Sequence, residues 1–302
     1  MFKTKKLNNE VVKPCVVVQT DVKQIKGGQL FPVIYPNVFI CASKGSGKTS
    51  TIFHTLKKCT SNPTEVFIFS NTHDTDETWK QIKEWLEQKG NTFYTFKSIK
   101  NGKEDTLQQI METMREAPED ESTIPEENLP PAPIPIFFSE AEERRWKEKA
   151  AAKEEKMKAK IEKKKKGKGK IYPKRIFVFD DISGELKSPS LDTLLKQNRH
   201  FKAMTIVSSQ YFKDLKPSAR GQFQFFLIFP RIRDDTLEVI HKDSGVNIDF
   251  EDFMKMYKMA TSRKYNFFYI DTKNMKFRHN FNKELTIKCE EDSEEDDEEE
   301  DD

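Results

Sequence analysis

Short apolar runs alternate with amphipathic segments along the chain from residue 33 onward. The runs are strand-sized and rich in Val, Ile and Phe, whereas the segments between them repeat their apolar positions at helical spacing. Strands are expected over 33–42, 65–70, 92–96, 175–180, 203–209, 225–229 and 266–271. This alternation predicts an α/β domain with a mostly parallel central sheet flanked by helices.

Capping residues in front of the apolar stripes predict where the helices begin. The expected starts are just after Lys48, at Asp74 with Glu77 as its capping-box partner, at Ser188 followed by Pro189, and at Asp235 with Glu238. We interpret the apolar stripes that follow these starts as faces packed on the sheet.

The alternation stops between residues 117 and 174. This stretch is first Pro-rich and acidic, and over 141–170 it is Lys-rich, with a charge of +8 and almost no apolar residues. Such a composition suits an insertion, disordered or helical, that has no face to bury. A solvated linker is the simplest interpretation, and a DNA-contacting arm or a nuclear-import signal are alternatives. We therefore expect an N-terminal extension over 1–30, one domain over 31–288 interrupted by 117–174, and an acidic tail over 289–302.

Charge is segregated along the chain. The net charge is +2, but twelve of the last thirteen residues are Asp or Glu, so the remainder carries +14. A basic body indicates a polyanionic partner. The four Cys and five His show no disulfide or zinc-site spacing, and no run is long or apolar enough for a signal core or membrane span. A protein in a reducing, intracellular compartment is the expectation.

The most specific motif follows the first expected strand. The segment Ala42-Ser43-Lys44-Gly45-Ser46-Gly47-Lys48-Thr49 has the spacing of a P-loop, with Ala in place of the usual first Gly. Its glycines let backbone N–H groups turn around phosphates, and the helix N-terminus adds its dipole. Lys48 is expected on the β and γ phosphates of ATP, and Thr49 on Mg²⁺. The predicted nucleotide-binding residues are Ser43, Lys44, Gly45, Ser46, Gly47, Lys48, Thr49 and Ser50.

A second acidic motif ends the apolar strand over 175–180. Adjacent carboxylates at the end of a buried strand repel each other unless a cation or a polarised water is present. We assign Asp180 to Mg²⁺ and Asp181 to the attacking water. The alternative is that one of the two carboxylates only caps the following turn at 182–184.

The next expected strand ends in Gln210, an amide that can orient water near the γ phosphate. Arg199 precedes that strand and is a candidate arginine finger, acting within its own subunit or on a neighbour. A surface salt bridge is the alternative role for Arg199. Arg220, after Gln210, is the next candidate.

The order of these motifs resembles the FtsK/HerA superfamily of P-loop ATPases. The match lies in ASKGSGKT, FVFDD and NRHFKAMTIVSSQ, and it is strongest with the poxvirus-type genome packaging ATPases of large DNA viruses and virophages. The resemblance implies a P-loop NTPase fold of the RecA-like (ASCE) type. It also places Arg199 as the arginine upstream of the strand and Gln210 as the polar sensor. Asp181 departs from the wider superfamily, which commonly has Glu there.

The resemblance implies a homo-oligomeric ring, hexameric by analogy, that hydrolyses ATP to drive double-stranded DNA into a capsid. Its partners would be DNA, bound without sequence specificity, and a capsid or portal-type protein, in the host cytoplasm, a virus factory or the virion. The basic body agrees with contacts to the phosphate backbone. A small-molecule or nucleotide kinase and a nucleotide-gated scaffold are the alternatives. ATPase rates with and without long double-stranded DNA distinguish the three.

Overall fold

The computed structural model describes residues 21–116 and 170–286. The strands are β1 (Asn37–Cys41), β2 (Glu65–Ser70), β3 (Phe93–Phe96), β4 (Lys100–Asn101), β5 (Glu104–Asp105), β6 (Arg175–Asp180), β7 (Ala203–Ser209), β8 (Phe225–Ile228), β9 (Phe268–Asp271), β10 (Lys276–His279) and β11 (Lys283–Leu285). The α-helices are α1 (Lys48–Cys59), α2 (Glu77–Lys89), α3 (Thr106–Glu116), α5 (Pro189–Gln197), α6 (Pro217–Arg220), α7 (Asp234–Ser244) and α8 (Phe250–Ala260). The short 3₁₀ helices are η1 (Val22–Gln24), η3 (Ser183–Glu185) and η4 (Phe212–Asp214).

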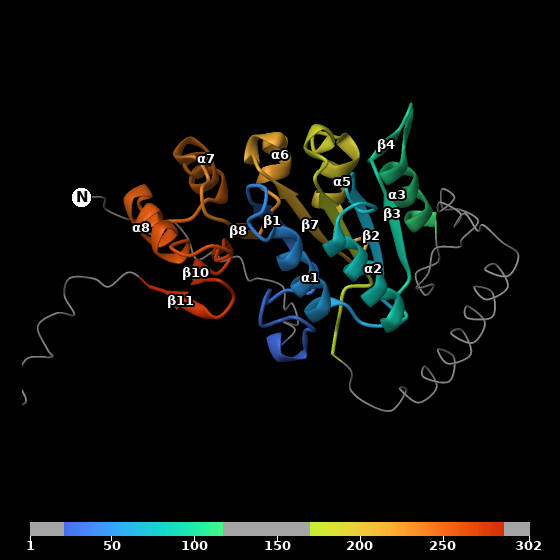
Figure 1. Ribbon diagram of the computed structural model, residues 1–302, viewed down its shortest axis with the longest axis horizontal. Helices are drawn as coiled ribbons and strands as arrows, with labels where there is room; N and C mark the ends of the chain where they lie inside the picture. Colours follow the sequence, from blue (N-terminus) through green and yellow to red (C-terminus); the bar gives the residue numbers. More distant parts are fainter. Residues whose placement is uncertain (1–20, 117–169, 287–302) are drawn as a thin grey trace, which may run out of the picture.

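Nine of the described strands form one sheet in the order β11-β10-β9-β8-β1-β7-β6-β2-β3. The strands from β8 to β3 in this order are parallel, and β9, β10 and β11 continue the sheet antiparallel. Figure 1 shows β3 near one end of the domain and β11 near the other. The predicted α/β class with a mostly parallel sheet is confirmed. The strand β7 lies between β1 and β6, so the ends of all three strands meet at one edge of the sheet.

Helices cover both faces of the sheet. Helices α1 and α2 bury Ile52, Leu56 and Trp79 against one face, together with aliphatic residues of the central strands. Helices α3, α5, α7 and α8 pack against the other face, which is rich in Phe. On that face Phe67 of β2 stacks on Phe177 of β6 at a centroid distance of 4.8 Å. Stacked aromatic pairs across neighbouring strands explain why so many of the 24 Phe are needed for the core.

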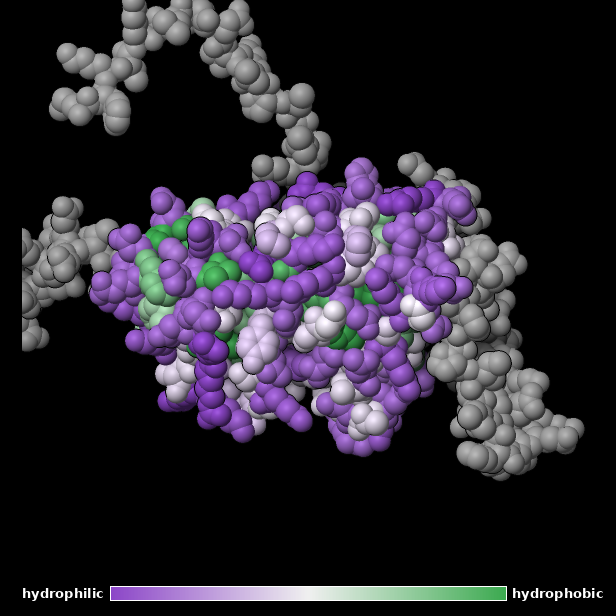
Figure 2. All heavy atoms as spheres, turned by 90° about the horizontal axis from the view of Figure 1, so that it is seen from above, coloured by the Kyte–Doolittle hydropathy of each residue, from purple (hydrophilic) through white to green (hydrophobic). Residues whose placement is uncertain are grey.

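Hydrophilic residues cover most of the face seen from above in Figure 2, and hydrophobic residues appear there only as separate patches. Within residues 21–116 and 170–286, no helix has the length and apolar character needed to cross a bilayer. These observations describe a domain whose apolar side chains are packed inside the two helical layers.

Two predicted helix starts are wrong. Helix α2 begins two residues later than expected, because the carboxylate of Asp76, and not that of Asp74, accepts the N–H groups of Thr78 and Trp79. Asp74 instead pairs with the ring of His73 at 2.8 Å. Helix α7 follows Arg233, whose side chain makes no capping bond, so Asp235 lies inside the first turn. There it favours the helix dipole without capping a backbone N–H.

The other expected elements are present with small shifts. Residues 32–35 form a bend, so the first strand starts at Asn37 and not at residue 33. Helix α1 includes Lys48 as its first residue, one residue earlier than expected, and α5 follows its cap Ser188 as predicted. The sequence patterns did not identify α3, α6, α8, β10, β11 or the β4–β5 hairpin.

The described chain packs on the sheet before residue 31. Ile25 and Leu30 are buried, and the backbone of Lys26 donates to the carbonyl of Ile171 at 2.8 Å. Apart from 170–174, the expected insertion over 117–174 lies outside the described residues. The same is true of the acidic tail over 289–302.

Candidate nucleotide site

The P-loop connects the end of β1 to the start of α1. Strand β1 is buried between β7 and β8, and Lys48 is the first residue of α1. Gly45 and Gly47 have φ of +73° and +94°, a left-handed backbone that favours glycine. The hydroxyl of Ser46 donates to the carbonyl of Ser43 at 2.6 Å and closes the turn. The loop therefore has the strand, turn and helix context that its motif requires.

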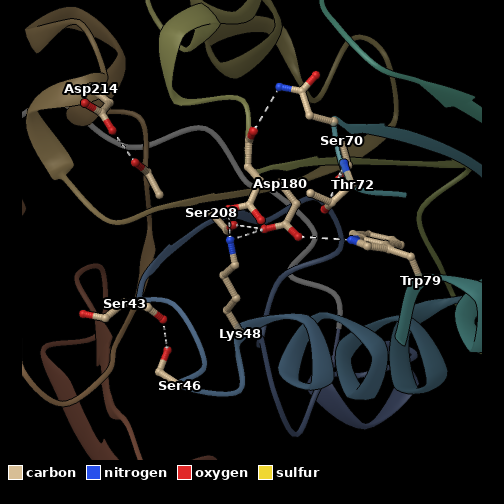
Figure 3. A network of polar contacts seen from close by, with 12 residues as sticks. Ser43, Ser46, Lys48, Ser70, Thr72, Trp79, Asp180, Ser208 and Asp214 are labelled. Atoms are coloured by element: carbon tan, nitrogen blue, oxygen red, sulfur yellow. Dashed lines mark hydrogen bonds and ion pairs between the residues drawn. The ribbon is translucent and has the colours of Figure 1, made fainter. Parts of the chain in front are cut away.

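Lys48 meets both carboxylates of the acidic motif. Its Nζ lies 3.2 Å from Oδ1 of Asp180 and donates a hydrogen bond to Oδ1 of Asp181 (Figure 3). Burial lowers the pKa of Lys48, but the charges and hydrogen bonds of the two carboxylates outweigh burial and raise it above its usual value. The lysine is therefore held as a cation at the point where β1, β7 and β6 end.

Asp180 is completely buried and has two further partners. The indole Nε1 of Trp79, from α2, donates to its Oδ2 at 3.2 Å, and the hydroxyl of Ser208, from β7, donates to its Oδ1. Burial raises the pKa of Asp180, while Lys48 and Ser208 act in the opposite direction. Three elements far apart in the sequence thus fix one carboxylate in position.

Asp181 differs from Asp180 in exposure and backbone. Its side chain is 40% exposed, and its φ of +55° is uncommon for a residue other than glycine. Its carbonyl accepts a hydrogen bond from the side chain of Asn71 at 3.3 Å. Neither carboxylate caps the turn that follows, because η3 begins after Ile182 and has no side-chain cap. The capping alternative is therefore wrong, and both carboxylates face Lys48.

The end of β7 lies at the same edge of the sheet as the P-loop. The N–H of Ala42 bonds to the carbonyl of Ser209 at 3.1 Å, and the thiol of Cys41 lies 3.6 Å from the carbonyl of Gln210. The side chain of Gln210 is exposed. The hydroxyl of Ser209 donates to Asp214 and accepts the N–H of Tyr211, so the segment after β7 is tied back on itself.

The arginine candidates lie away from the carboxylates. Arg199 is exposed and precedes β7, so it lies at the opposite edge of the sheet from the P-loop of its own chain. Arg220 is occupied within the chain: it bonds to the carbonyl of Leu215 at 3.1 Å and to Asp243 at 3.2 Å. The structure therefore brings Lys48 to the two aspartates and leaves both arginines outside this cluster.

The residues present fit the Mg²⁺ ion that a P-loop site implies. Asp180 supplies a buried carboxylate, and Thr49 lies on the first turn of α1, next to Lys48. The described residues contain no group of three or more His, Cys, Asp or Glu side chains that could hold a metal by themselves. Mg²⁺ takes one or two protein ligands and completes its shell with phosphates and waters, so Asp180 and Thr49 would be enough to hold it.

A family comparison matches the second half of the chain. The model of the family described as Poxvirus A32 protein matches residues 145–299, slightly more than half of the 302 residues. The chain belongs to the Poxvirus A32 protein family. The matched region contains Asp180, Asp181, Arg199 and Gln210, and the P-loop lies outside it. The resemblance to poxvirus-type ATPases inferred from the motifs is confirmed by this membership.

Solved structures of a viral NTPase are also similar to this chain. The genome packaging NTPase B204 from Sulfolobus turreted icosahedral virus 2, in complex with AMP, is 16% identical with a TM-score of 0.44, covering 81% of this chain and 96% of its own. Its complex with AMPPCP is 15% identical, with the same TM-score and coverage. The DNA-packaging ATPase B204 from Sulfolobus Turreted Icosahedral Virus is 16% identical with a TM-score of 0.42, covering 80% of this chain and 95% of its own. No curated protein matches the chain.

The sequence analysis missed two residues that bond to Asp180, Trp79 and Ser208, and a third, Asp214, that bonds to Ser209 at the end of β7. Trp79 was assigned only to the core stripe of its helix, and Ser208 and Asp214 were given no role. An indole or a hydroxyl carries no local signal that it bonds to a carboxylate distant in the sequence. The buried run ending at Ser208-Ser209 was a usable signal, because polar residues at the end of a buried parallel strand lie at the edge where ligands bind.

Proposed function

We propose that this chain is an ATPase that uses ATP hydrolysis to package double-stranded DNA into a viral capsid. The observation that carries the proposal is the contact of the P-loop lysine, Lys48, with Asp180 and Asp181 across the intervening strand β7. A phosphate-binding loop facing two carboxylates is suited to hydrolysis, whereas binding alone does not need the second carboxylate. Membership in the Poxvirus A32 protein family supports the same class of function.

The residues of the site divide the work. Lys48, held as a cation, would exchange part of its pairing with the aspartates for the β and γ phosphates. Thr49 and Asp180 would hold Mg²⁺, which neutralises charge on the phosphates when bound. Asp181 is the more exposed carboxylate, so it is the one that water can reach and that can accept a proton from it. Trp79 and Ser208 keep Asp180 in one orientation.

The DNA part of the proposal rests on charge. Outside the acidic tail the chain carries +14, which suits contacts with phosphates without reading of the sequence. Arg199 is exposed and remote from the P-loop of its own chain, so we assign it to the nucleotide site of a neighbouring copy. We therefore include in the proposal a homo-oligomeric ring, a capsid or portal-type partner, and action in the host cytoplasm or a virus factory.

The test measures the ATPase rate of the full chain with and without long double-stranded DNA. A packaging motor is stimulated by DNA, a kinase requires a small acceptor, and a scaffold does not turn over. Lys48→Ala should abolish tight ATP binding, whereas Asp181→Asn should keep ATP binding and lose turnover. Lys58→Ala, at an exposed position later in α1, is the matched control and should behave as the parent. Parental turnover in Asp181→Asn would show that this carboxylate is not the base.

A further inference from the structure

The loop that joins α8 to β9 reaches the P-loop from the other side of β1. In the sheet, Cys41 at the end of β1 is level with Ile228 of β8, which in turn pairs with Phe268 at the start of β9. Because β9 runs antiparallel to β8, the loop before it arrives at the same edge as the P-loop. Strands β7 and β6, with the aspartates, lie on the opposite side of β1.

Tyr265 of this loop lies against the P-loop backbone. A Cβ added to Gly47 would lie 3.0 Å from Cδ1 of the Tyr265 ring, closer than a side chain there could be accommodated without a shift. Tyr265 is nonetheless 57% exposed. The Nζ of Lys264 lies 4.7 Å from the centroid of the ring, so one face carries a cation–π contact, and the proposal concerns the rest of the exposed ring.

The backbone of Tyr265 is held in an uncommon conformation. Its φ is +70°, a left-handed conformation that costs free energy for a residue other than glycine. The neighbouring residues fix the loop: Asn280 donates to the side chain of Asn266 at 3.1 Å and accepts the N–H of Phe267 at 2.9 Å. The ring is thus positioned by its surroundings and not by local preference.

A polar cavity adjoins the loop. It has a volume of about 470 Å³, and its lining includes Ser262, Arg263, Asn266, His279 and Asn280. The Nε2 atom of His279 is buried and has no hydrogen-bond partner within the described residues. Tyr265 does not line the cavity, but Arg263 and Asn266 of the same loop do, so the loop that carries the ring also offers hydrogen-bond donors and acceptors.

We propose that the loop over 261–266 is the base-binding part of the nucleotide site, with the Tyr265 ring as the surface on which the purine base stacks. This inference rests on the proposed ATPase function. The terminal phosphates are directed to Lys48, on the side of the aspartates, so the ribose and base extend across Gly47 to the opposite side of β1. In this arrangement the edge of the base would form hydrogen bonds with polar residues of the cavity, such as Arg263 and Asn266. Tyr265 is a positioning and specificity residue, since it does not touch the reacting phosphate.

The test compares ATP with inorganic tripolyphosphate, which has the phosphates but no base. Stacking of a base on an aromatic ring predicts that Tyr265→Ala weakens ATP binding about 5- to 150-fold. Tripolyphosphate binding should not change, and Tyr265→Phe, which keeps the ring, should bind ATP as the parent does. Met275→Ala is the control, because Met275 is also exposed and also has a positive φ, but lies in the turn between β9 and β10.

A second readout reports stacking directly. In Tyr265→Trp the new indole should lose fluorescence when ATP is added and keep it when tripolyphosphate is added. Equal weakening of both ligands in Tyr265→Ala would show that the ring only supports the P-loop, and no weakening of either would show that it has no role; both results overturn the inference. If the parent protein binds neither ATP nor tripolyphosphate, the proposed function itself fails.

Discussion

Replacing Trp79 by Phe removes one hydrogen bond from the most deeply buried carboxylate of the site. The indole Nε1 donates to Oδ2 of Asp180 at 3.2 Å, and both side chains are fully buried. Phe keeps an aromatic ring in the same layer, among Ile82, Leu86 and the strands. The substitution therefore removes the indole N–H donor and reduces the ring volume slightly, and it leaves the other contacts of the ring in place.

The expected loss of stability follows from these contacts. A hydrogen bond to a charged group contributes about 1.5–3 kcal/mol, and the carboxylate left without it cannot reach water. The smaller ring costs roughly 1 kcal/mol more, by comparison with other large-to-small substitutions in cores. We expect the free energy of unfolding to fall by about 3 kcal/mol. Trp85→Phe is the control in the same helix: Trp85 is only partly buried and makes no hydrogen bond within the described residues, so about 1 kcal/mol or less is expected.

The assay is urea unfolding of the parent, Trp79→Phe, Asp180→Ala and the double variant. If the hydrogen bond has the assigned strength, the double-mutant cycle should give a coupling free energy of about 1.5–3 kcal/mol between positions 79 and 180. A coupling below about 0.5 kcal/mol would refute the reasoning, because that is the error expected for independent sites. The rate of ATP hydrolysis is a second measure. Loss of a partner that orients a metal ligand typically lowers activity about 10- to 100-fold, so Trp79→Phe should lower this rate by a similar factor.

Three further predictions test other parts of the chain. Mixing Arg199→Ala with Lys48→Ala protein, each inactive alone, should restore ATPase activity if Arg199 serves a neighbouring copy; its loss alone should cost about 10³- to 10⁵-fold in turnover, and mixed rings without recovery would exclude a role in trans. Deleting the tail from Glu290 onward should strengthen DNA binding, chiefly near about 50 mM salt, and equal affinities there would reject competition by the tail. Burial raises the pKa of Cys41, with Asp214 adding to the shift, and the pKa of Cys59, each to about 12. At pH 8 only about one thiol in 10⁴ is ionised, so peptide mapping after alkylation should find both unmodified unless the protein is unfolded.

Most strands could be predicted because their signal is local. The runs over 65–70, 175–180 and 203–209 are continuous, buried and rich in Phe, Val and Ile, and the structure has strands with these bounds. The first residues of the helices were harder to predict than the strands. The segment before α2 offers two aspartates, Asp74 and Asp76, and which of them caps the helix depends on contacts made by the folded chain, among them the pairing of Asp74 with His73.

The last strands show why some elements were missed. Strands β10 and β11 are short and have polar residues at most positions, and Phe277 is their one buried residue, so neither alternation nor apolar runs mark them. They are strands because β10 adds to the edge of β9, and β11 adds in turn to β10. Their strand conformation depends on pairing with neighbouring strands, which the residues of a short sequence window do not reveal.

The sequence by itself determined the P-loop, the acidic pair at the end of β6 and the α/β class. The two motifs depend on residue types at fixed spacing within a short segment, and the class depends on the local apolar pattern of each strand and helix. Tertiary structure decided that β7 lies between β1 and β6, so that Lys48 meets Asp180 and Asp181. It also brought the indole of Trp79 to Asp180, 101 residues away, and Tyr265 to Gly47. These contacts depend on strand order and on the packing of side chains from distant segments, whereas periodicity and turn chemistry act only between near neighbours in the chain.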